Sequence, residues 1–135
     1  MCSLNLRALV LVIATSAITS CASMPRAVTR TPVEVWRPGC CGLTLRLRDA
    51  LEAGLQASAW FELAVTAQPN ALVIVIPDVN AKPARARLEA IYSVDFTTVS
   101  GERLGTSSGS CWDDELSKCV DHIIRDATIA ARKIH

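Results

Sequence analysis

An apolar segment that ends at a cysteine separates the first 20 residues from the rest of this 135-residue chain. Residues 8–18 are mostly apolar and follow a short stretch whose single charged residue is Arg7. A transmembrane helix needs roughly 20 apolar residues, whereas this shorter run has the length of a secretory signal. We therefore predict that residues 1–20 are a signal peptide, and removal of 20 from 135 residues leaves 115 for the fold.

The junction Ile18-Thr19-Ser20-Cys21 resembles the lipobox of bacterial lipoproteins, with small residues before a cysteine where the apolar run stops. The resemblance implies that Cys21 is acylated, for example with palmitate, and becomes the mature N-terminus. Ala22 stands where an Asp would mark inner-membrane retention, so the resemblance implies an outer-membrane anchor on the periplasmic face. Several acyl chains, at about 0.8 kcal/mol per buried CH₂, hold a domain without a spanning helix. The alternative is an ordinary secretory peptide that is cut elsewhere.

The part of the chain after this junction suits one domain with a single core. The whole chain has 14 basic and 13 acidic residues, and Arg7 leaves with the leader, so the remaining charges balance. A balanced charge gives no electrostatic basis for binding nucleic acid, and none is expected as a partner. Residues 21–38 are Pro-containing and are predicted to be a tether, in which residues 33–36 form a short edge strand. Residues 39–135 are predicted to be a single globular α/β domain.

Two amphipathic helices are predicted from apolar residues with helical spacing. In residues 43–58 these are Leu43, Leu47, Leu51 and Leu55. Gly54 costs about 1 kcal/mol there relative to Ala, and we interpret it as room for another element to pack closely. In the helix near the C-terminus the spaced residues are Leu116, Val120, Ile123, Ala127, Ala130, Ala131 and Ile134. We expect Ser110 as its N-cap, acidic residues 113–115 in its first turn and basic residues 132–133 in its last.

Four strands are predicted over residues 60–66, 71–76, 86–99 and 102–108. The second is a continuous apolar run, which is typical of a strand covered on both faces. The third alternates as a half-exposed strand does, and its apolar face consists of Leu88, Ala90, Tyr92, Val94 and Phe96. Residues 80–83 are predicted to be a polar turn, and Ser100-Gly101 a tight turn. The predicted fold class is α+β, with two helices packed on one face of a four-stranded mixed sheet that is cross-linked by disulfides.

Four cysteines remain for an oxidising compartment once the leader is lost and Cys21 is acylated: Cys40, Cys41, Cys111 and Cys119. They allow three connectivities. Adjacent cysteines close a strained ring, and a Cys111–Cys119 bridge spans two turns if both residues lie on the second helix. We therefore expect the Cys40-Cys41 pair to be tied to Cys111 and Cys119. Each bridge would close a loop of about 70 residues and stabilise the fold by about 4 kcal/mol.

The expected bridges also constrain the directions of the strands. If all four strands alternated in direction, the two helices would begin at opposite ends of the sheet. Parallel pairing of residues 61–66 with residues 71–76 would bring the helix N-termini together, and we therefore predict it. Such a short connection between parallel strands is unusual.

No constellation of residues predicts catalysis, a metal site or a cofactor. His122 lies beside Asp121 and one turn before Asp126, which is a pattern that could be catalytic or metal-binding. A solvated helix face accounts for it better. The cysteines lack the C-x-x-C pattern of redox sites and the paired spacing that zinc prefers.

The tryptophans are the candidate contacts for a partner. Trp36, Trp60 and Trp112 each flank an element, and such rings are enriched at interfaces. Packing over a disulfide is the alternative use. Trp60-Phe61 must place one ring on each face of its strand.

Residues 43–134 resemble a class of small periplasmic lipoprotein domains in the order of their elements. The stretches that carry the likeness are Leu43–Ser58, Phe61-Glu62-Leu63, Ala71–Ile76, Ala90–Thr98 and Ser100-Gly101-Glu102. The class includes the TolB amino-terminal domain, the periplasmic part of the curli-export lipoprotein, the lipoprotein activators of penicillin-binding proteins and the auxiliary lipoproteins of lipid-transport ABC systems. The likeness is architectural and carries over no site residue.

Three functional hypotheses follow. The first is an outer-membrane lipoprotein, held to the membrane through lipid on Cys21, that binds or scaffolds an envelope protein partner. The second is an auxiliary lipoprotein of an envelope transport system for lipid or another hydrophobic ligand, which an open groove between helix and sheet would favour. The third is a periplasmic enzyme, which a cleft containing His122 and two acidic neighbours would favour. We expect no enzyme activity and no cofactor.

Overall fold

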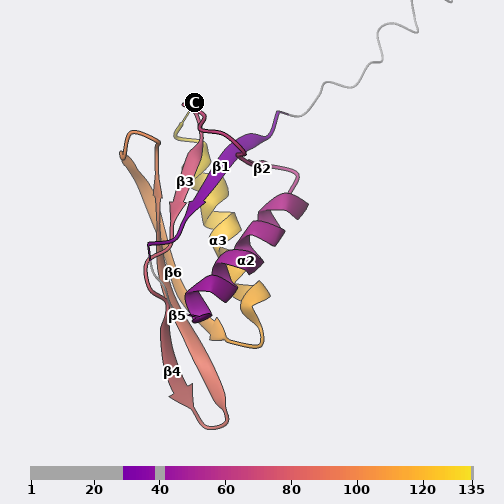
Figure 1. Ribbon diagram of the computed structural model, residues 1–135, viewed down its shortest axis with the longest axis vertical. Coiled ribbons are helices and arrows are strands. Elements are labelled where there is room, and N and C mark those ends of the chain that lie inside the picture. Colours follow the sequence, from indigo (N-terminus) through magenta and orange to yellow (C-terminus); the bar gives the residue numbers. More distant parts are fainter. Residues whose placement is uncertain (1–28, 39–41, 135) are drawn as a thin grey trace, which may run out of the picture.

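The computed structural model describes residues 29–38 and 42–134. The predicted leader, the lipobox with Cys21, and the residues Cys40 and Cys41 lie outside the described residues. Within them the chain forms six strands and two helices (Figure 1). In chain order these are β1 (Thr31–Trp36), α2 (Gly42–Ala57), β2 (Phe61–Leu63), β3 (Leu72–Val75), β4 (Asn80–Ala84), β5 (Arg87–Thr97), β6 (Arg103–Trp112) and α3 (Leu116–Ala131). The α+β class and the mixed sheet are confirmed, but the sheet has six strands where four were predicted.

β1 is an internal strand of the sheet, and the prediction of an edge strand was wrong. It pairs in parallel with β2 on one side and β3 on the other, so that Val33 lies opposite both Leu63 and Leu72. Proline lacks an N–H and is normally confined to the edges and ends of strands. Pro32 is tolerated because pairing with β3 begins one residue later, at Val33. The sheet therefore begins at Thr31, inside the segment that we predicted to be a tether.

β2 and β3 run in the same direction, but they do not pair with each other as predicted for residues 61–66 and 71–76. β1 lies between them and is parallel to both. The prediction gave residues 33–36 only an edge position, so it needed an unusually short parallel connection. With β1 in the middle, the long link through α2 joins the parallel strands β1 and β2.

β5 pairs with three strands, all of them antiparallel. β3 and β4 follow each other along one edge of β5, and β6 lies along its other edge. Residues 80–83, predicted to be a turn, belong to β4 instead. The chain turns at residues 85–86, where Arg85 has a φ of 56°. Because four of the five residues of β4 are exposed, its sequence lacks the alternation that identifies a half-buried strand.

The two helices begin at the same end of the sheet (Figure 1), as predicted. α2 follows β1 and α3 follows β6, and these strands point the same way because the direction reverses twice, at β5 and at β6. Near the start of α2, the Arg46 guanidinium donates to the backbone oxygen of Asp113 at 2.7 Å. It also lies 3.7 Å from the Asp113 carboxylate. This contact joins the starts of the two helices.

α3 begins at Leu116, later than predicted, and the prediction of Ser110 as its N-cap was wrong. Ser110 lies in β6 opposite Ile91, because β6 continues to Trp112. The N-cap is Glu115, whose side chain makes no capping hydrogen bond. Acidic residues 113–115 therefore form the turn before the helix, and basic residues 132–133 follow its end.

The core lies between the helices and one face of the sheet. Leu47, Leu51 and Leu55 of α2 and Ile123 of α3 are fully buried. Neither α2 nor α3 has the length and apolar character of a membrane-spanning helix.

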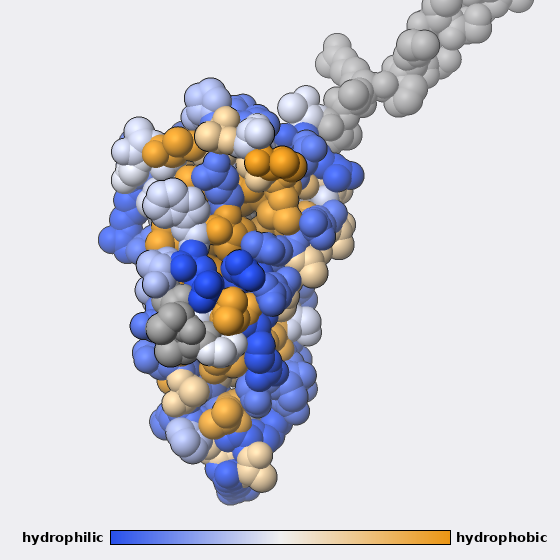
Figure 2. Space-filling view, viewed as in Figure 1, coloured by the Kyte–Doolittle hydropathy of each residue, from blue (hydrophilic) through white to orange (hydrophobic). Residues whose placement is uncertain are grey.

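The apolar face of β5 is buried as predicted along most of the strand: Ala90, Tyr92, Val94 and Phe96. Leu88 is 39% exposed, because the hairpin of β4 and β5 extends beyond the helices at the bottom of Figure 1. The space-filling view in Figure 2 shows that this end of the molecule is mostly hydrophilic, whereas hydrophobic side chains gather over its wider end.

Gly54 lies where α2 packs against Val120 and Ile124 of α3. A Cβ atom at this position would lie 2.7 Å from Cγ1 of Val120 and 3.0 Å from Cδ1 of Ile124. Val120 is buried and its side chain is short, so it has little freedom to move away. The interpretation of Gly54 as room for another element is therefore confirmed.

We predict that Gly54→Ala lowers the free energy of unfolding by about 1–2 kcal/mol. Overpacking costs about 1–3 kcal/mol, and it outweighs the gain of about 1 kcal/mol in helix propensity. The matched control is Gly42→Ala in the same helix, where a Cβ meets nothing within 4 Å; this variant should lose no stability. Urea unfolding measures both. A Gly54→Ala protein as stable as the parent would contradict the close approach, and Val120→Ala should relieve the Gly54→Ala defect.

Candidate functional site

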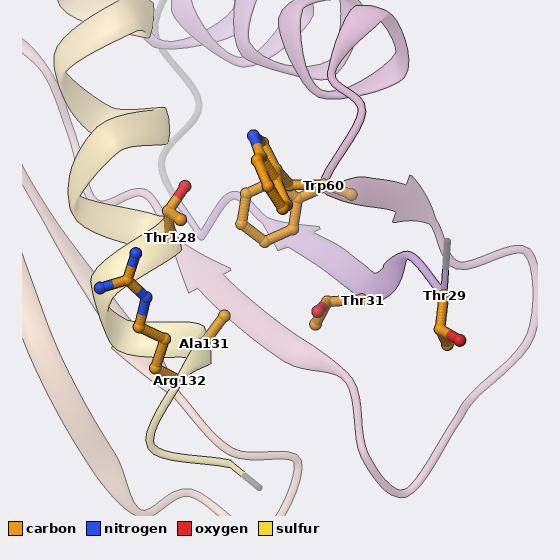
Figure 3. A pocket seen from close by; sticks show the side chains of 7 residues that line it. Thr29, Thr31, Trp60, Thr128, Ala131 and Arg132 are labelled. Carbon is orange, nitrogen blue, oxygen red and sulfur yellow. The ribbon is translucent and has the colours of Figure 1, made fainter. Parts of the chain in front are cut away.

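A shallow pocket beside an exposed tryptophan lies between β1, β2 and α3 (Figure 3). Its volume is about 210 Å³. The residues that line it are Thr29, Thr31, Trp60, Phe61, Thr128, Ala131 and Arg132. We call it the Trp60 pocket.

The backbone between α2 and β2 presents Trp60 to solvent. The Trp60 N–H donates to the Ser58 hydroxyl at 3.1 Å. The Trp60 carbonyl oxygen accepts from the Thr31 N–H at 2.9 Å, which fixes this segment beside β1. Phe61 is buried in the core, whereas Trp60 is 63% exposed. Trp60 lies just before β2, which begins at Phe61, and both residues line the Trp60 pocket, so the prediction of one ring on each face of the strand is not confirmed.

α3 supplies the opposite wall of the pocket from its last turns. Figure 3 shows Thr128 on this helix near Trp60, and the Arg132 side chain extending from the last turn along the helix toward Thr128. The Thr128 hydroxyl already donates to the Ile124 carbonyl oxygen at 2.9 Å. Ala131 is buried and Arg132 is exposed at the end of the helix. The arrangement can hold an apolar group against the indole, with a guanidinium close by for a negative charge.

The other two predicted tryptophans lie elsewhere. Trp36 is the last residue of β1 and is 61% exposed. Trp112 is the last residue of β6 and is partly buried, with the guanidinium carbon of Arg87 4.5 Å from its ring centroid. This is the geometry of a cation–π contact. Trp36 lines a different and more open pocket of about 300 Å³ with Glu34 and Glu52, so Trp60 is the candidate that lines the Trp60 pocket.

The acidic turn before α3 is paired with basic residues of three different elements. Asp113 contacts Arg46, Glu115 lies 2.9 Å from Lys118, and Arg87 donates to Asp114 at 2.6 Å. The hydrogen bond from Arg87 lowers the pKa of Asp114 below its ordinary value, and the same contact raises the pKa of Arg87. These ion pairs explain the cluster of acidic residues without a bound metal ion.

His122 lies on the exposed flank of α3. Its Nε2 is 3.1 Å from the Asp126 carboxylate, one turn away, and its ring meets that of Tyr92 edge-on with centroids 6.4 Å apart. The His122 side chain is 48% exposed, in keeping with a solvated helix face. In the described residues no group of three or more His, Cys, Asp or Glu side chains is placed to hold a metal.

Tyr92 is the single tyrosine of the chain, and its hydroxyl is buried near Ser107. Neither the Tyr92 hydroxyl nor the Ser107 hydroxyl has a hydrogen-bond partner among the described residues. A Cβ at Gly109 would lie 3.0 Å from the Tyr92 hydroxyl, so this glycine leaves the space for the ring. Burial raises the pKa of Tyr92, the neighbouring Ser107 hydroxyl opposes the shift, and the Asp126 charge adds to it.

We predict that the protein loses stability at alkaline pH through Tyr92. The pKa of Tyr92 is higher in the folded state than in the unfolded state. The stabilising contribution of neutral Tyr92 to the free energy of unfolding is therefore complete below about pH 10 and is lost as pH rises through the folded-state pKa. Tyrosinate absorbance isolates this group, since no other tyrosine contributes. Tyr92→Phe should remove the effect and leave neutral-pH stability within about 1 kcal/mol of the parent, because the hydroxyl lacks a partner. Identical titration curves in native and urea-unfolded protein would contradict the shift.

Cys111 and Cys119 are bridged to each other, and the expected ties from Cys40-Cys41 to these two residues were wrong. Their Cα atoms are 5.8 Å apart across a sequence separation of 8, within the usual range for a disulfide. The prediction assumed that both cysteines lie on the helix. Cys111 instead lies in β6 opposite Ala90, and the turn at residues 113–115 folds α3 back across the strand.

We predict that replacing Cys111 and Cys119 together with alanine lowers the free energy of unfolding by about 2.5 kcal/mol, from the chain-entropy cost of this short loop. Cleavage of the non-reduced parent after Lys118 should leave two peptides joined by a disulfide. Non-reducing peptide mapping that found Cys111 linked to Cys40 or Cys41 would contradict the bridge.

Comparison with known proteins gives only distant structural likenesses. No protein-family model matches the chain, and neither does any curated protein sequence. A minor lipoprotein from Acinetobacter baumannii aligns with a TM-score of 0.48 and 13% identity, over 78% of this chain and 97% of its own. A lipoprotein from Neisseria meningitidis aligns with a TM-score of 0.35 and 12% identity, over 73% of this chain and 98% of its own. Scores this low carry no argument about family or activity, and the resemblances to named lipoprotein classes stay predictions.

Proposed function

We propose that this chain is a periplasmic lipoprotein, anchored in the outer membrane through Cys21, whose globular domain binds a protein partner in an envelope assembly. The Trp60 pocket is the contact that holds the partner. The observation that carries the proposal is a 63% exposed indole that lines a pocket of about 210 Å³. Tryptophan is enriched among the residues that contribute most to protein interfaces.

The size of the pocket supports a protein side chain as its occupant. Sites for small-molecule ligands measure about 300–1,000 Å³, and this pocket is smaller. It is also open to solvent along the exposed indole. An apolar side chain presented by a folded partner fits these dimensions better than a free ligand does.

The packed interface between the helices and the sheet does not support the alternative of a lipid-handling transporter subunit. That hypothesis predicts an open groove between helix and sheet. Leu47, Leu51 and Leu55 of α2 are instead fully buried, so side chains fill the space over this part of the sheet.

The position of the pocket supports a partner held close to the membrane. Thr29 lines the pocket and follows Cys21 by eight positions. Eight extended residues span at most about 28 Å. A partner held at Trp60 would therefore lie within about that distance of the anchor, which suits an assembly at the inner surface of the outer membrane.

The test is copurification with the lipidated full chain extracted from membranes in mild detergent. Trp60→Ala should weaken capture of the partner about 30-fold, because truncation of a central interface tryptophan costs about 2 kcal/mol or more. The matched control is Trp36→Ala, which removes an equally exposed tryptophan outside the pocket; it should leave capture unchanged.

Two results would contradict the proposal. If mass spectrometry of the parent protein found an unmodified Cys21, the proposed lipid anchor would be wrong. Retention of lipid without any envelope protein, or equal capture by the parent and by Trp60→Ala, would remove the partner-binding role of the pocket.

A further inference from the structure

The outer edge of β6 is open along a strand of 10 residues. Among the described strands, β6 pairs with β5 alone. Exposed edges present unpaired N–H and C=O groups, and proteins usually protect them with lysine, proline, bulges or a covering element. Residues 104–112 contain neither proline nor a charged residue. This edge therefore lacks most of the usual protection.

The backbone pattern identifies which groups face outward. The Asp113 N–H donates to the Leu88 carbonyl oxygen at 2.9 Å, so these two residues form a hydrogen-bonded pair. In an antiparallel pair, the backbone N–H and C=O groups of successive residues point alternately toward the partner strand and away from it. Residues 107, 109 and 111 therefore bond to β5, and Thr106, Ser108 and Ser110 direct their N–H and C=O groups to the open edge. Their side chains are exposed as well.

Both ends of this edge are closed. At one end, Lys133 Nζ donates to the Leu104 carbonyl oxygen at 2.8 Å. At the other end, the Trp112 carbonyl oxygen accepts from the Glu115 N–H at 2.9 Å. Between these two bonded carbonyl groups, Thr106, Ser108 and Ser110 direct both their N–H and their C=O groups outward, and this open segment is symmetric about Ser108.

We propose that β6 is a self-association edge, at which a second copy of the chain pairs antiparallel with Ser108 opposite Ser108. In this register Thr106 lies opposite Ser110 of the other copy. The three N–H groups and three C=O groups of the segment then all find partners, because an antiparallel hydrogen-bonded pair exchanges two bonds. Gly105 and Gly109 leave the strand without bulky neighbours at the centre of the contact. The two sheets become one continuous sheet.

Charge favours a second copy over an unrelated peptide. Lys133 lies at the start of β6 beside Arg103, which already pairs with Asp95. Acidic residues 113–115 lie just beyond the end of β6 and already pair with Arg46, Arg87 and Lys118. Antiparallel pairing brings the basic end of each strand beside the acidic turn of the other copy. Like charges would meet only if the strands paired in parallel.

The flank of α3 above the edge adds an apolar contact. Asp126, Ile129 and Lys133 share a shallow pocket with Thr106 of β6, so this flank overlies the open edge. Ile129 is 54% exposed there. Pairing through β6 would bring the two α3 helices side by side and cover Ile129.

A charge-reversal experiment tests the register. The full chain is extracted in detergent, and its dissociation constant is measured by sedimentation velocity. Lys133→Glu and Glu115→Lys should each weaken self-association about ten-fold, because each creates two like-charge contacts per dimer. An equimolar mixture of the two variants should restore the parent affinity, since both contacts in the mixed dimer join opposite charges. Glu115 makes no side-chain capping bond, but Glu115→Lys also removes its pairs with Lys118 and Arg87, so thermal unfolding of each single variant must show that it is folded.

A backbone variant tests the hydrogen bonds independently. Ser108→Pro removes an outward N–H that the β5 ladder does not use, and it should weaken self-association by more than about ten-fold. Ser108→Ala keeps this N–H and should associate like the parent. Thermal unfolding establishes that both variants are folded.

The proposal is overturned if the parent protein remains monomeric at every concentration, or if the mixture associates no better than the separate variants. It is also overturned if Ser108→Pro folds and associates like the parent. A monomer that instead adds an extended peptide to β6 would replace the second copy with another occupant. Failure of Trp60→Ala to alter partner capture bears on the Trp60 pocket and leaves this test unaffected.

Discussion

The alternation of buried and exposed residues along β5 is the constraint on which the rest of the fold depends. β5 pairs with β3, β4 and β6, so its register positions every strand on that side of the sheet. A slip of one residue would turn Ser93 and Asp95 into the core and expose Val94 and Phe96. Strand pairing along this edge of β5 is interrupted between β3 and β4, opposite the middle of β5. There the buried Thr44 hydroxyl accepts a hydrogen bond from the Val79 N–H at 3.0 Å. A side chain of α2 thus replaces the hydrogen bond that a continuous strand would have made.

The direction of β5 also determines where the helices start. Since β1 and β6 point the same way, both helices return across the sheet from the same end. Three contacts converge there: Arg46 with Asp113, Arg87 with Asp114, and the Cys111–Cys119 bridge. The exposed ion pairs contribute little individually, whereas the covalent bridge fixes α3 against the last residues of β6. Gly54 then sets how closely α2 and α3 approach along their length.

Periodic segments with a covered face could be predicted from sequence, and segments whose pairing depends on distant residues could not. α2 follows from its leucines, and β5 from its alternation, because burial imposes the pattern locally. β4 is exposed and therefore carries no pattern. β1 has apolar residues, but only the later part of the chain supplies the strands that make it internal. The disulfide could not be assigned because its geometry depends on β6 ending at Trp112, which puts Cys111 on a strand.

The same distinction applies to the candidate site. Trp60 could be named from the sequence as a candidate contact, but its exposure depends on the bend before β2, where its N–H bonds to Ser58 and its carbonyl oxygen to Thr31. The other wall of the pocket could not be predicted, since Thr128 and Arg132 reach it only when α3 crosses the sheet. No local signal marks a threonine and an arginine on a helix as the wall of a pocket formed by β1 and β2.

The two proposed contacts lie at opposite edges of the sheet, and the last turns of α3 connect them. The Trp60 pocket lies at β1 and β2 and includes Thr128 and Arg132, whereas the self-association edge lies at β6 beside Ile129 and Lys133. Antiparallel pairing of β6 with its copy requires a two-fold axis perpendicular to the sheet. The starts of the two β1 strands then lie at diagonally opposite corners of the joined sheet. If Cys21 is acylated as proposed, an axis perpendicular to the membrane would let both anchors enter it. The joined sheet would therefore lie along the membrane surface, with a Trp60 pocket at each end.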